Sequence, residues 1–243
     1  MDISSRRVDP EILDAIDPAD PRAMRSRRDL QRVHRALRTV SILSQAVERI
    51  RLARPPRSIL ELGGGDATLL LRFARALQPR WQHVSLTVLD NQDVVRAETS
   101  AAYRSLGWDL QLVRQDALQW AVQPDSPHYD LCITNLFLHH FDGAALQSLL
   151  RATARHCDAL IACEPRRSTL AMLGSKAIGL LGTNSITRQD AVTSVIAGFT
   201  GRELTRNWPA DLQGWSCEEY SAFPFVHCFT AARSSDSSAA APL

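Results

Sequence analysis

Three consecutive glycines follow a short apolar segment, in the sequence Ile59-Leu60-Glu61-Leu62-Gly63-Gly64-Gly65-Asp66. Glycine permits positive φ in a tight turn, and its missing Cβ lets a ligand lie against the backbone. A helix beginning near Asp66 would direct its unpaired N–H groups and its positive dipole end toward the same place. These residues predict a ligand-binding turn between a buried strand and a helix. The simpler alternative is a turn in which the glycines serve geometry alone.

The charge beside this turn restricts the ligand. A dinucleotide fingerprint has the pattern G-x-G-x-x-G, and counted from Gly63 its third glycine would fall at Thr68. Glu61 instead places a carboxylate two residues before the first glycine, where it would repel a pyrophosphate and attract a sulfonium and an ammonium group. This combination suits S-adenosylmethionine and predicts that Glu61, Gly63, Gly64 and Gly65 contact it.

Acids also follow the next two predicted strands. Asp90, with Asn91 beside it, ends the run Val84–Asp90, and its carboxylate can accept hydrogen bonds from both ribose hydroxyls. Asp116, followed by Ala117, comes after the run Leu110–Val113 and can accept from an adenine amino group. Either acid alone could be a helix cap or a turn former. Because open α/β sheets bind ligands at strand carboxyl ends, three such acids together predict a nucleoside site.

The elements that must position these residues alternate in type. From residue 58 onward, short apolar runs alternate with helical segments, such as Gln92–Tyr103, which indicates a parallel sheet with helices on both faces. The last two runs, Trp215–Tyr220 and Phe225–Ala231, are too close for a parallel crossover and therefore predict an antiparallel hairpin. The predicted fold is α/β, with a Rossmann-like, doubly wound, seven-stranded sheet that is mostly parallel and ends in that hairpin.

The N-terminal region predicts a helical cap over residues 1–57. Residues 1–20 form a loose lead-in, and Asp20-Pro21 is a typical helix start. Apolar residues then recur every three or four positions, which predicts one long or broken helix over about 22–53. Residues 58–233 form the ligand-binding domain, and residues 234–243 are expected to be a disordered tail.

Composition excludes several classes of protein. The chain has 243 residues, 45% hydrophobic and 22% charged, which excludes a disordered chain or a coiled coil. No run of about 18 apolar residues predicts a membrane span, and no signal peptide is recognisable, so the expected compartment is the cytoplasm. Five cysteines without a CxxC pair favour reduced, packed thiols and no metal site.

The basic N-terminal region raises the question of a nucleic-acid partner. Residues 1–57 hold 13 Arg and 8 acidic residues, a balance of +5 in a chain whose net charge is +2. These arginines alternate with acids and with the apolar stripe, a pattern that favours a solvated helix face over a phosphate-binding arm.

From Ser58 to Arg233 the chain resembles the class I S-adenosylmethionine-dependent methyltransferases. ELGGGDAT matches the first motif of that family, although Ala67 stands where many members have a third glycine. Leu89-Asp90 resembles the ribose-binding acid, and Gln115-Asp116-Ala117 resembles the adenine-edge motif. The segment 129–141, which contains TNLFLHHF, is similar to the fourth-strand motif of small-molecule and quinone-type members. The resemblance implies S-adenosylmethionine as cofactor, with Asn135 among its contacts.

The fourth-strand loop also carries the candidate catalytic residues. Members that methylate exocyclic amines have an Asn/Asp-Pro-Pro-aromatic loop here, and Asn135-Leu136-Phe137-Leu138 lacks it, which argues against nucleic acid as substrate. A histidine is a plausible base at neutral pH, and the resemblance favours His140 first and His139 second. The alternative is that these histidines pack or cap a helix and that neither acts as a base.

The predicted acceptor is a small molecule, aromatic or lipid-tailed. The apolar segment Thr169–Leu181 would form one wall of its pocket or, alternatively, pack in the core. Arg166 and Arg167 would orient an acidic group or lie on the surface. The expected reaction is O-methylation of a phenolic, enolic or carboxylic acceptor in secondary metabolism. C-methylation of a quinone-type ring and a catalytically silent cofactor-binding or regulatory module are the alternatives. Peripheral membrane contact, and a monomer or a homodimer, remain open.

Overall fold

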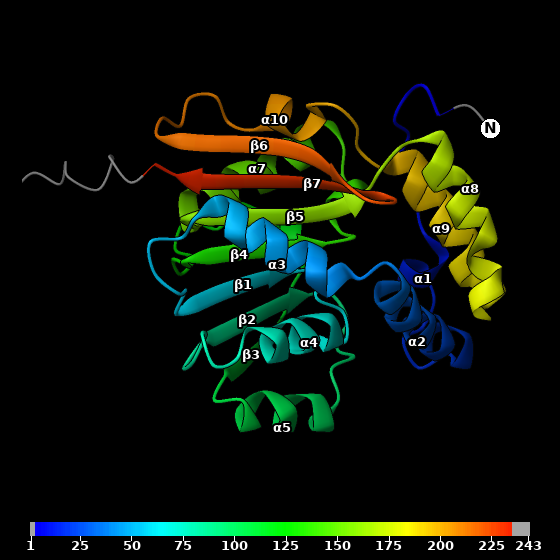
Figure 1. Cartoon of the computed structure of the whole chain (residues 1–243), viewed down its shortest axis with the longest axis horizontal. Helices are drawn as coiled ribbons and strands as arrows, with labels where there is room; N and C mark the ends of the chain where they lie inside the picture. Colours follow the sequence, from blue (N-terminus) through cyan, green and yellow to red (C-terminus); the bar gives the residue numbers. More distant parts are fainter. Residues whose placement is uncertain (1–2, 235–243) are drawn as a thin grey trace, which may run out of the picture.

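The computed structural model describes residues 3–234, and its centre is one sheet (Figure 1). The strands are β1 (Ser58–Leu62), β2 (Ser85–Asp90), β3 (Asp109–Arg114), β4 (Leu131–Asn135), β5 (Ala159–Pro165), β6 (Trp215–Ala222) and β7 (Val226–Arg233). They form a seven-stranded sheet in the order β3-β2-β1-β4-β5-β7-β6. Strands β1 to β5 pair in parallel, and β7 is antiparallel to both β5 and β6. The predicted fold class is confirmed.

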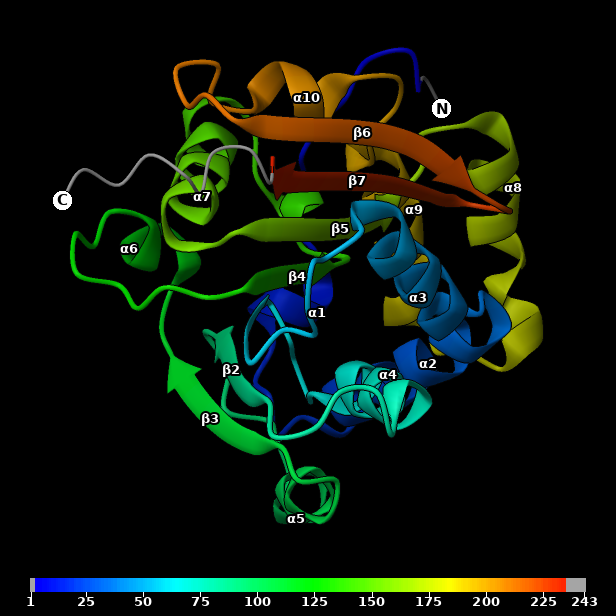
Figure 2. The ribbon, with the colours of Figure 1, turned by 60° about the vertical axis from the view of Figure 1, so that its left-hand side comes forward.

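Helices cover both faces of the sheet (Figures 1 and 2). On one face, α3 (Thr39–Ile50), α4 (Thr68–Leu77) and α5 (Ala97–Ser105) bury apolar side chains against the strands. On the other, α6 (Ala117–Ala121), α7 (Gly143–His156) and α10 (Glu203–Asn207) do the same. Each fully buried Leu or Phe in these layers stabilises the fold by roughly 1.5–3 kcal/mol.

A third group of helices lies beyond the carboxyl ends of the parallel strands, and we call it the cap (Figure 1). It contains α1 (Ile12–Ala15), α2 (Pro21–Ala36), α8 (Thr169–Ala177), the 3-10 helix η2 (Ile178–Leu181) and α9 (Ser185–Ala197). No helix in the described part of the chain is long and apolar enough to span a bilayer.

The N-terminal helical stripe is broken. Asp20 accepts a hydrogen bond from the Arg22 N–H at 2.7 Å and Pro21 is the first helical residue, so the predicted helix start is confirmed. The chain leaves helical geometry at Arg38, where φ is +54°. The break lets α2 join the cap while α3 packs against the sheet, with Leu43 fully buried.

Two expectations about local structure were wrong. The described part of the lead-in, residues 3–20, is not loose, because it forms α1 and makes hydrogen bonds to α9 and to the loop after β4. The helix expected from Gln92 begins only at Ala97.

The five cysteines are free, and four are buried. The tail predicted to be disordered lies, from residue 235 on, outside the described residues.

Candidate active site

One cavity of about 750 Å³ lies between the carboxyl edge of the sheet and the cap. The glycine turn and the ends of β1, β2, β4 and β5 form one side, and α2, α8 and α9 form the other. The predicted cofactor-binding and catalytic residues all line this cavity: Glu61, Gly63, Gly64, Gly65, Asp90, Asn91, Asp116, Ala117, Asn135, His139 and His140.

The glycine turn has a backbone that other residues would not tolerate. Gly63 and Gly65 have φ values of +69° and +53°. A Cβ on Gly63 would overlap the ring of Phe137, and one on Gly64 would overlap Val88 and the Glu61 carboxylate. The turn therefore needs glycine for backbone geometry and for close packing, in addition to any contact with a ligand.

Asp90 ties this turn to the end of β2. Its Oδ2 accepts a hydrogen bond from the Gly65 N–H at 2.9 Å, and its Oδ1 accepts from the Gln92 N–H at 2.8 Å. A carboxylate offers about four acceptor positions. Asp90 can therefore support the turn and still accept from hydroxyl groups in the cavity.

Glu61 is the most unusual group at this end of the cavity. Its side chain is buried, and its Oε2 has no hydrogen-bond partner. Burial raises the pKa of Glu61 well above its usual range, and the charges of Asp90 and Asp66 add to the effect. A buried acceptor without a partner is costly. A cationic group in the cavity would relieve that cost.

Asp116 has the capping role that the sequence left open. Its Oδ1 accepts hydrogen bonds from the Leu118 N–H at 2.8 Å and the Gln119 N–H at 3.0 Å, at the start of α6. The residue also lines the cavity. Capping fixes the direction of the carboxylate, so the two roles are compatible.

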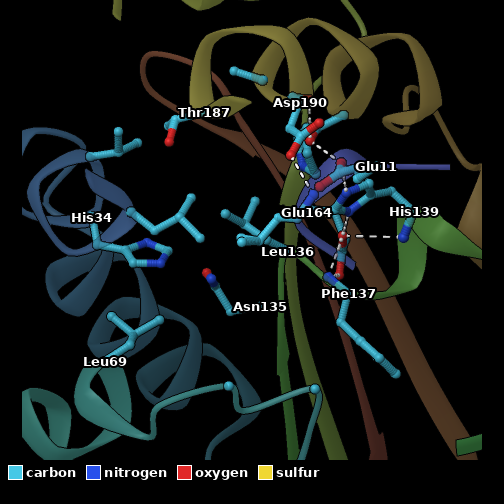
Figure 3. A pocket seen from close by; sticks show the side chains of 18 of the residues that line it. Glu11, His34, Leu69, Asn135, Leu136, Phe137, His139, Glu164, Thr187 and Asp190 are labelled. Atoms are coloured by element: carbon cyan, nitrogen blue, oxygen red, sulfur yellow. Dashed lines mark hydrogen bonds and ion pairs between the residues drawn. The ribbon is translucent and has the colours of Figure 1, made fainter. Parts of the chain in front are cut away.

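His139 lies between two carboxylates from distant parts of the chain (Figure 3). Its Nδ1 is 2.8 Å from Glu164 Oε2, at the end of β5, and its Nε2 is 3.2 Å from Glu11 Oε1. Burial alone would lower the pKa of His139, but the hydrogen bonds and charges of Glu11 and Glu164 outweigh it and raise the pKa to about 9. His139 is therefore protonated at neutral pH and donates from both ring nitrogens.

Glu164 also holds the loop after β4 in place. Its carboxylate accepts from the backbone N–H groups of Phe137 at 3.2 Å, Leu138 at 3.0 Å and His139 at 3.4 Å, at the start of η1 (Leu138–His140). Sequence reasoning missed Glu164. The signal was available, because this acid ends a buried strand as Glu61 and Asp90 do.

His140 differs from His139 in exposure and charge. Its ring lies 4.2 Å from the His139 ring, centroid to centroid, and its Nδ1 is 3.3 Å from Asp14 Oδ2. Burial and the charge of His139 lower the pKa of His140, against the opposing charges of Glu11, Asp14 and Glu164. His140 is therefore neutral at pH 7, and its side chain is only partly buried.

The N-terminal segment completes this end of the cavity through contacts that the sequence did not predict. Arg6 donates to the carbonyl oxygens of Phe141, at 2.7 Å, and Ala197, at 2.7 Å. Asp190 on α9 accepts from the N–H groups of Ile12 and Leu13 at 2.9 and 3.0 Å. These bonds fix Glu11, which also accepts from the Ser194 hydroxyl.

The remaining wall of the cavity is mostly apolar. It includes His34, whose burial lowers its pKa to about 4, so that this ring is neutral (Figure 3). Segment 169–181 takes both roles that the sequence left open: Ala171 and Met172 are buried, and the later residues face the cavity. The apolar lining includes Leu30, Val33, Leu37, Leu69, Ile178, Leu180, Leu181, Val195 and Phe225.

Arg166 and Arg167 do not line the cavity. Arg167 is buried and donates to Glu203 at 2.6 Å and to the Gly198 carbonyl at 2.6 Å, so its role is structural.

For a metal ion, the described residues offer Glu11, His139 and His140, whose ligand atoms lie within 4.8 Å of one another. Both ring nitrogens of His139, however, already face carboxylates.

Comparison with known proteins assigns the domain. Residues 59–159 match a family model described as a methyltransferase domain. Over these residues the chain is similar to methyltransferases, in line with the family resemblance of its motifs. The match begins in β1 and ends at the first residue of β5, so it contains the glycine turn, Asp90, Asp116 and both histidines. No curated protein matches the sequence.

Solved methyltransferase structures share the fold at low sequence identity. The plantazolicin methyltransferase BpumL, in complex with SAH, is 13% identical with a TM-score of 0.64, covering 88% of this chain and 91% of that one. An O-methyltransferase family protein from Burkholderia thailandensis is 18% identical with a TM-score of 0.58, covering 89% and 61%. The magnesium protoporphyrin IX methyltransferase ChlM from Synechocystis PCC 6803, with bound SAH, is 19% identical with a TM-score of 0.50, covering 82% and 84%.

Proposed function

We propose that this methyltransferase O-methylates a hydrophobic small molecule with a phenolic, enolic or carboxylic group, using S-adenosylmethionine. The observation that carries the proposal is the division of the cavity: an acidic glycine turn with an unpartnered Glu61 oxygen at one end, and a neutral histidine paired with an acid at the other. Between them the lining is apolar.

The residues of the glycine turn fit the cofactor. The unpartnered Oε2 of Glu61 would receive its ammonium group, and the open space at Gly65, where an added Cβ would meet nothing, leaves room for the ligand. Asp90 would accept from the ribose hydroxyls, with Asn91 beside it, and Asp116 and Ala117 would border the adenine. Asn135 would contact the cofactor from the end of β4. When bound, the cofactor supplies a methyl group on a sulfonium, and SAH remains after transfer.

His140 is the base that the geometry supports. Its pKa is below the ordinary value, so it is unprotonated at pH 7 and can accept a proton from an acceptor hydroxyl. Asp14 would stabilise the imidazolium that forms. His139, the second candidate, is protonated at neutral pH, and both of its ring nitrogens donate to carboxylates. It therefore cannot readily accept a proton, and we assign it the role of a fixed positive charge near the acceptor oxygen.

The acceptor class is supported by the cavity and by two solved relatives. Its wall is mainly aliphatic, which favours an aromatic or lipid-tailed molecule. The structures named for plantazolicin and magnesium protoporphyrin IX support a small molecule over nucleic acid. C-methylation of a quinone-type ring would use the same base. Only the position of the new methyl group in the product distinguishes that reaction from O-methylation.

Two measurements test the proposal. Calorimetry with S-adenosylmethionine and SAH should show a loss of affinity of about 10-fold or more for Asp90→Ala, since hydrogen bonds to a charged group are worth about 1.5–3 kcal/mol. The matched control is Asp93→Ala, an exposed acid nearby that does not line the cavity. A mass-spectrometric screen of phenolic and lipid-tailed acceptors should then show the gain of one methyl group. Cofactor binding without turnover on any acceptor would instead favour a silent binding module.

A further inference from the structure

Exposed large apolar side chains gather on the outside of the cap. Leu170 and Leu173 lie on α8, Leu180 and Leu181 lie on η2, which follows α8 directly, and we call these four the leucine stripe. Leu180 is 90% exposed. Phe223, which is 87% exposed, lies at the turn between β6 and β7, next to α8, against which Phe225 packs at Gly174 (Figures 1 and 2). Exposed apolar residues in such a group mark an interaction surface.

The leucine stripe is continuous with the cavity. Leu180 and Leu181 line the cavity and are exposed to solvent at the same time, so they form part of its rim. A molecule held at the stripe therefore has direct access to the acceptor end of the site.

Cations flank the stripe. Lys176 is exposed on α8, between Leu173 and Leu180. The Arg188 side chain packs against Gly179 of η2, and Arg32 from α2 donates to the Leu181 carbonyl at 3.0 Å. Arg32 also pairs with buried Asp29, whereas no ion pair to Lys176 or Arg188 is found among residues 3–234. The surface is therefore apolar at its centre and positive at its edge.

We propose that the leucine stripe and Phe223 dock on an anionic lipid bilayer, from which the cavity takes a lipid-tailed acceptor. Leucine and phenylalanine side chains insert at the boundary between headgroups and acyl chains, while Lys and Arg stay at the level of the anionic headgroups. A second copy of this chain fits the surface less well, because symmetric docking would bring Lys176, Arg188 and Arg32 of both copies together. The claim that the cavity takes its acceptor from the bilayer rests on the proposed function, whereas the docking itself does not.

Vesicle sedimentation of the whole chain tests the docking. The protein should bind vesicles of phosphatidylcholine with about 30 mol % phosphatidylglycerol more tightly than vesicles of phosphatidylcholine alone, and binding should weaken at about 0.5 M NaCl. Leu170→Glu/Leu173→Glu should reduce the partition coefficient by about 10-fold or more. Lys176→Glu/Arg188→Glu should remove the preference for anionic vesicles. The control is Val122→Glu, because Val122 is 73% exposed, more than Leu170 at 52% or Leu173 at 61%, but lies after α6, away from the cap.

The outcomes separate docking from catalysis. None of these four substituted cap residues lines the cavity, so both variants should bind S-adenosylmethionine with unchanged affinity. That binding serves as the control that the variants are folded. Equal vesicle binding by wild type, stripe variant and control would overturn the proposal. So would a dimer in light scattering that only the stripe variant dissociates, since the stripe would then cover a second copy. Loss of cofactor binding in the wild type would overturn the proposed function and leave the vesicle result standing.

Discussion

Nε2 of His139 lies 3.2 Å from the carboxylate of Glu11, although 128 positions separate the two residues in the chain. With Glu164 on the other ring nitrogen, this contact places a protonated imidazole between two acids in the interior. The contact also attaches the N-terminal segment to the loop that carries both histidines. Closure of the cavity and the charge state of its acceptor end are therefore linked.

This arrangement predicts how stability depends on pH. The pKa of His139 is raised from 6.5 to about 9, so the folded state binds this proton more tightly than the unfolded state does. The stabilisation is complete below pH 6.5 and is lost as pH rises through about 9. The difference corresponds to about 3 kcal/mol, at about 1.4 kcal/mol for each pH unit. We expect Tm to fall between pH 6.5 and 9.5 when scanning fluorimetry is run across this range.

His139→Gln should flatten that part of the profile, because the variant has no proton to lose. His128→Gln is the control, since His128 is exposed and pairs with Asp158 at the surface. A wild-type profile that is flat from pH 6.5 to 9.5 would contradict the protonated assignment of His139.

Replacing Glu61 should change the stability of the protein and its affinity for the cofactor in opposite directions. Because its pKa is raised, the ionised carboxylate costs the cofactor-free protein stability at neutral pH. Glu61→Gln should therefore stabilise the cofactor-free protein at pH 8, where the neutral amide avoids the cost of burying a charge. The same variant should bind S-adenosylmethionine about 10-fold or more weakly, through loss of a charged acceptor. Denaturant unfolding and calorimetry measure the two effects, and a variant that loses both stability and affinity would show that Glu61 is merely structural.

Much of the cavity could be predicted because it is built from strand ends. Glu61, Asp90 and Asp116 each lie at or just after the carboxyl end of a predicted strand, so the sheet order brings them together. The cap end is different. Glu11 and Asp14 lie in a segment with no apolar periodicity, and their positions depend on hydrogen bonds from the Ile12 and Leu13 N–H groups to Asp190, which is 178 positions from Ile12. No local pattern encodes such a contact.

The break between α2 and α3 shows a second limit. The apolar stripe continues through Leu37 and Val40, so periodicity alone does not locate the break. The left-handed conformation of Arg38 is imposed by tertiary packing, since α2 must contact α9 while α3 contacts the sheet. Helix propensity predicts such a break poorly, because tertiary packing decides where the helix ends when two hydrophobic surfaces, here α9 and the sheet, pack against the same apolar stripe.

Metal removal should leave turnover in the proposed methylation unchanged. Glu11 and His139 already satisfy each other, and His139 is held by Glu164 on its other side, so the cluster needs no cation to balance it. Turnover after dialysis against EDTA, compared with turnover after adding Mg²⁺, Mn²⁺ or Zn²⁺, checks this. A loss that one of these ions restores would assign a metal to Glu11, His139 and His140.

The pH dependence of turnover tests His140 most directly. His140→Ala should lower kcat by about 10²–10⁴-fold while cofactor affinity changes little. In the wild type, kcat/KM should fall on the acid side with a midpoint below 6.5, because burial and the His139 charge lower the pKa of His140. Removing the positive charge in His139→Gln should move that midpoint to higher pH. Removing the negative charge in Asp14→Asn should move it to lower pH, since Asp14 favours protonation of His140. A purely structural role for these residues would lower activity at every pH without moving the midpoint, and opposite displacements in the two variants are what a base at His140 requires.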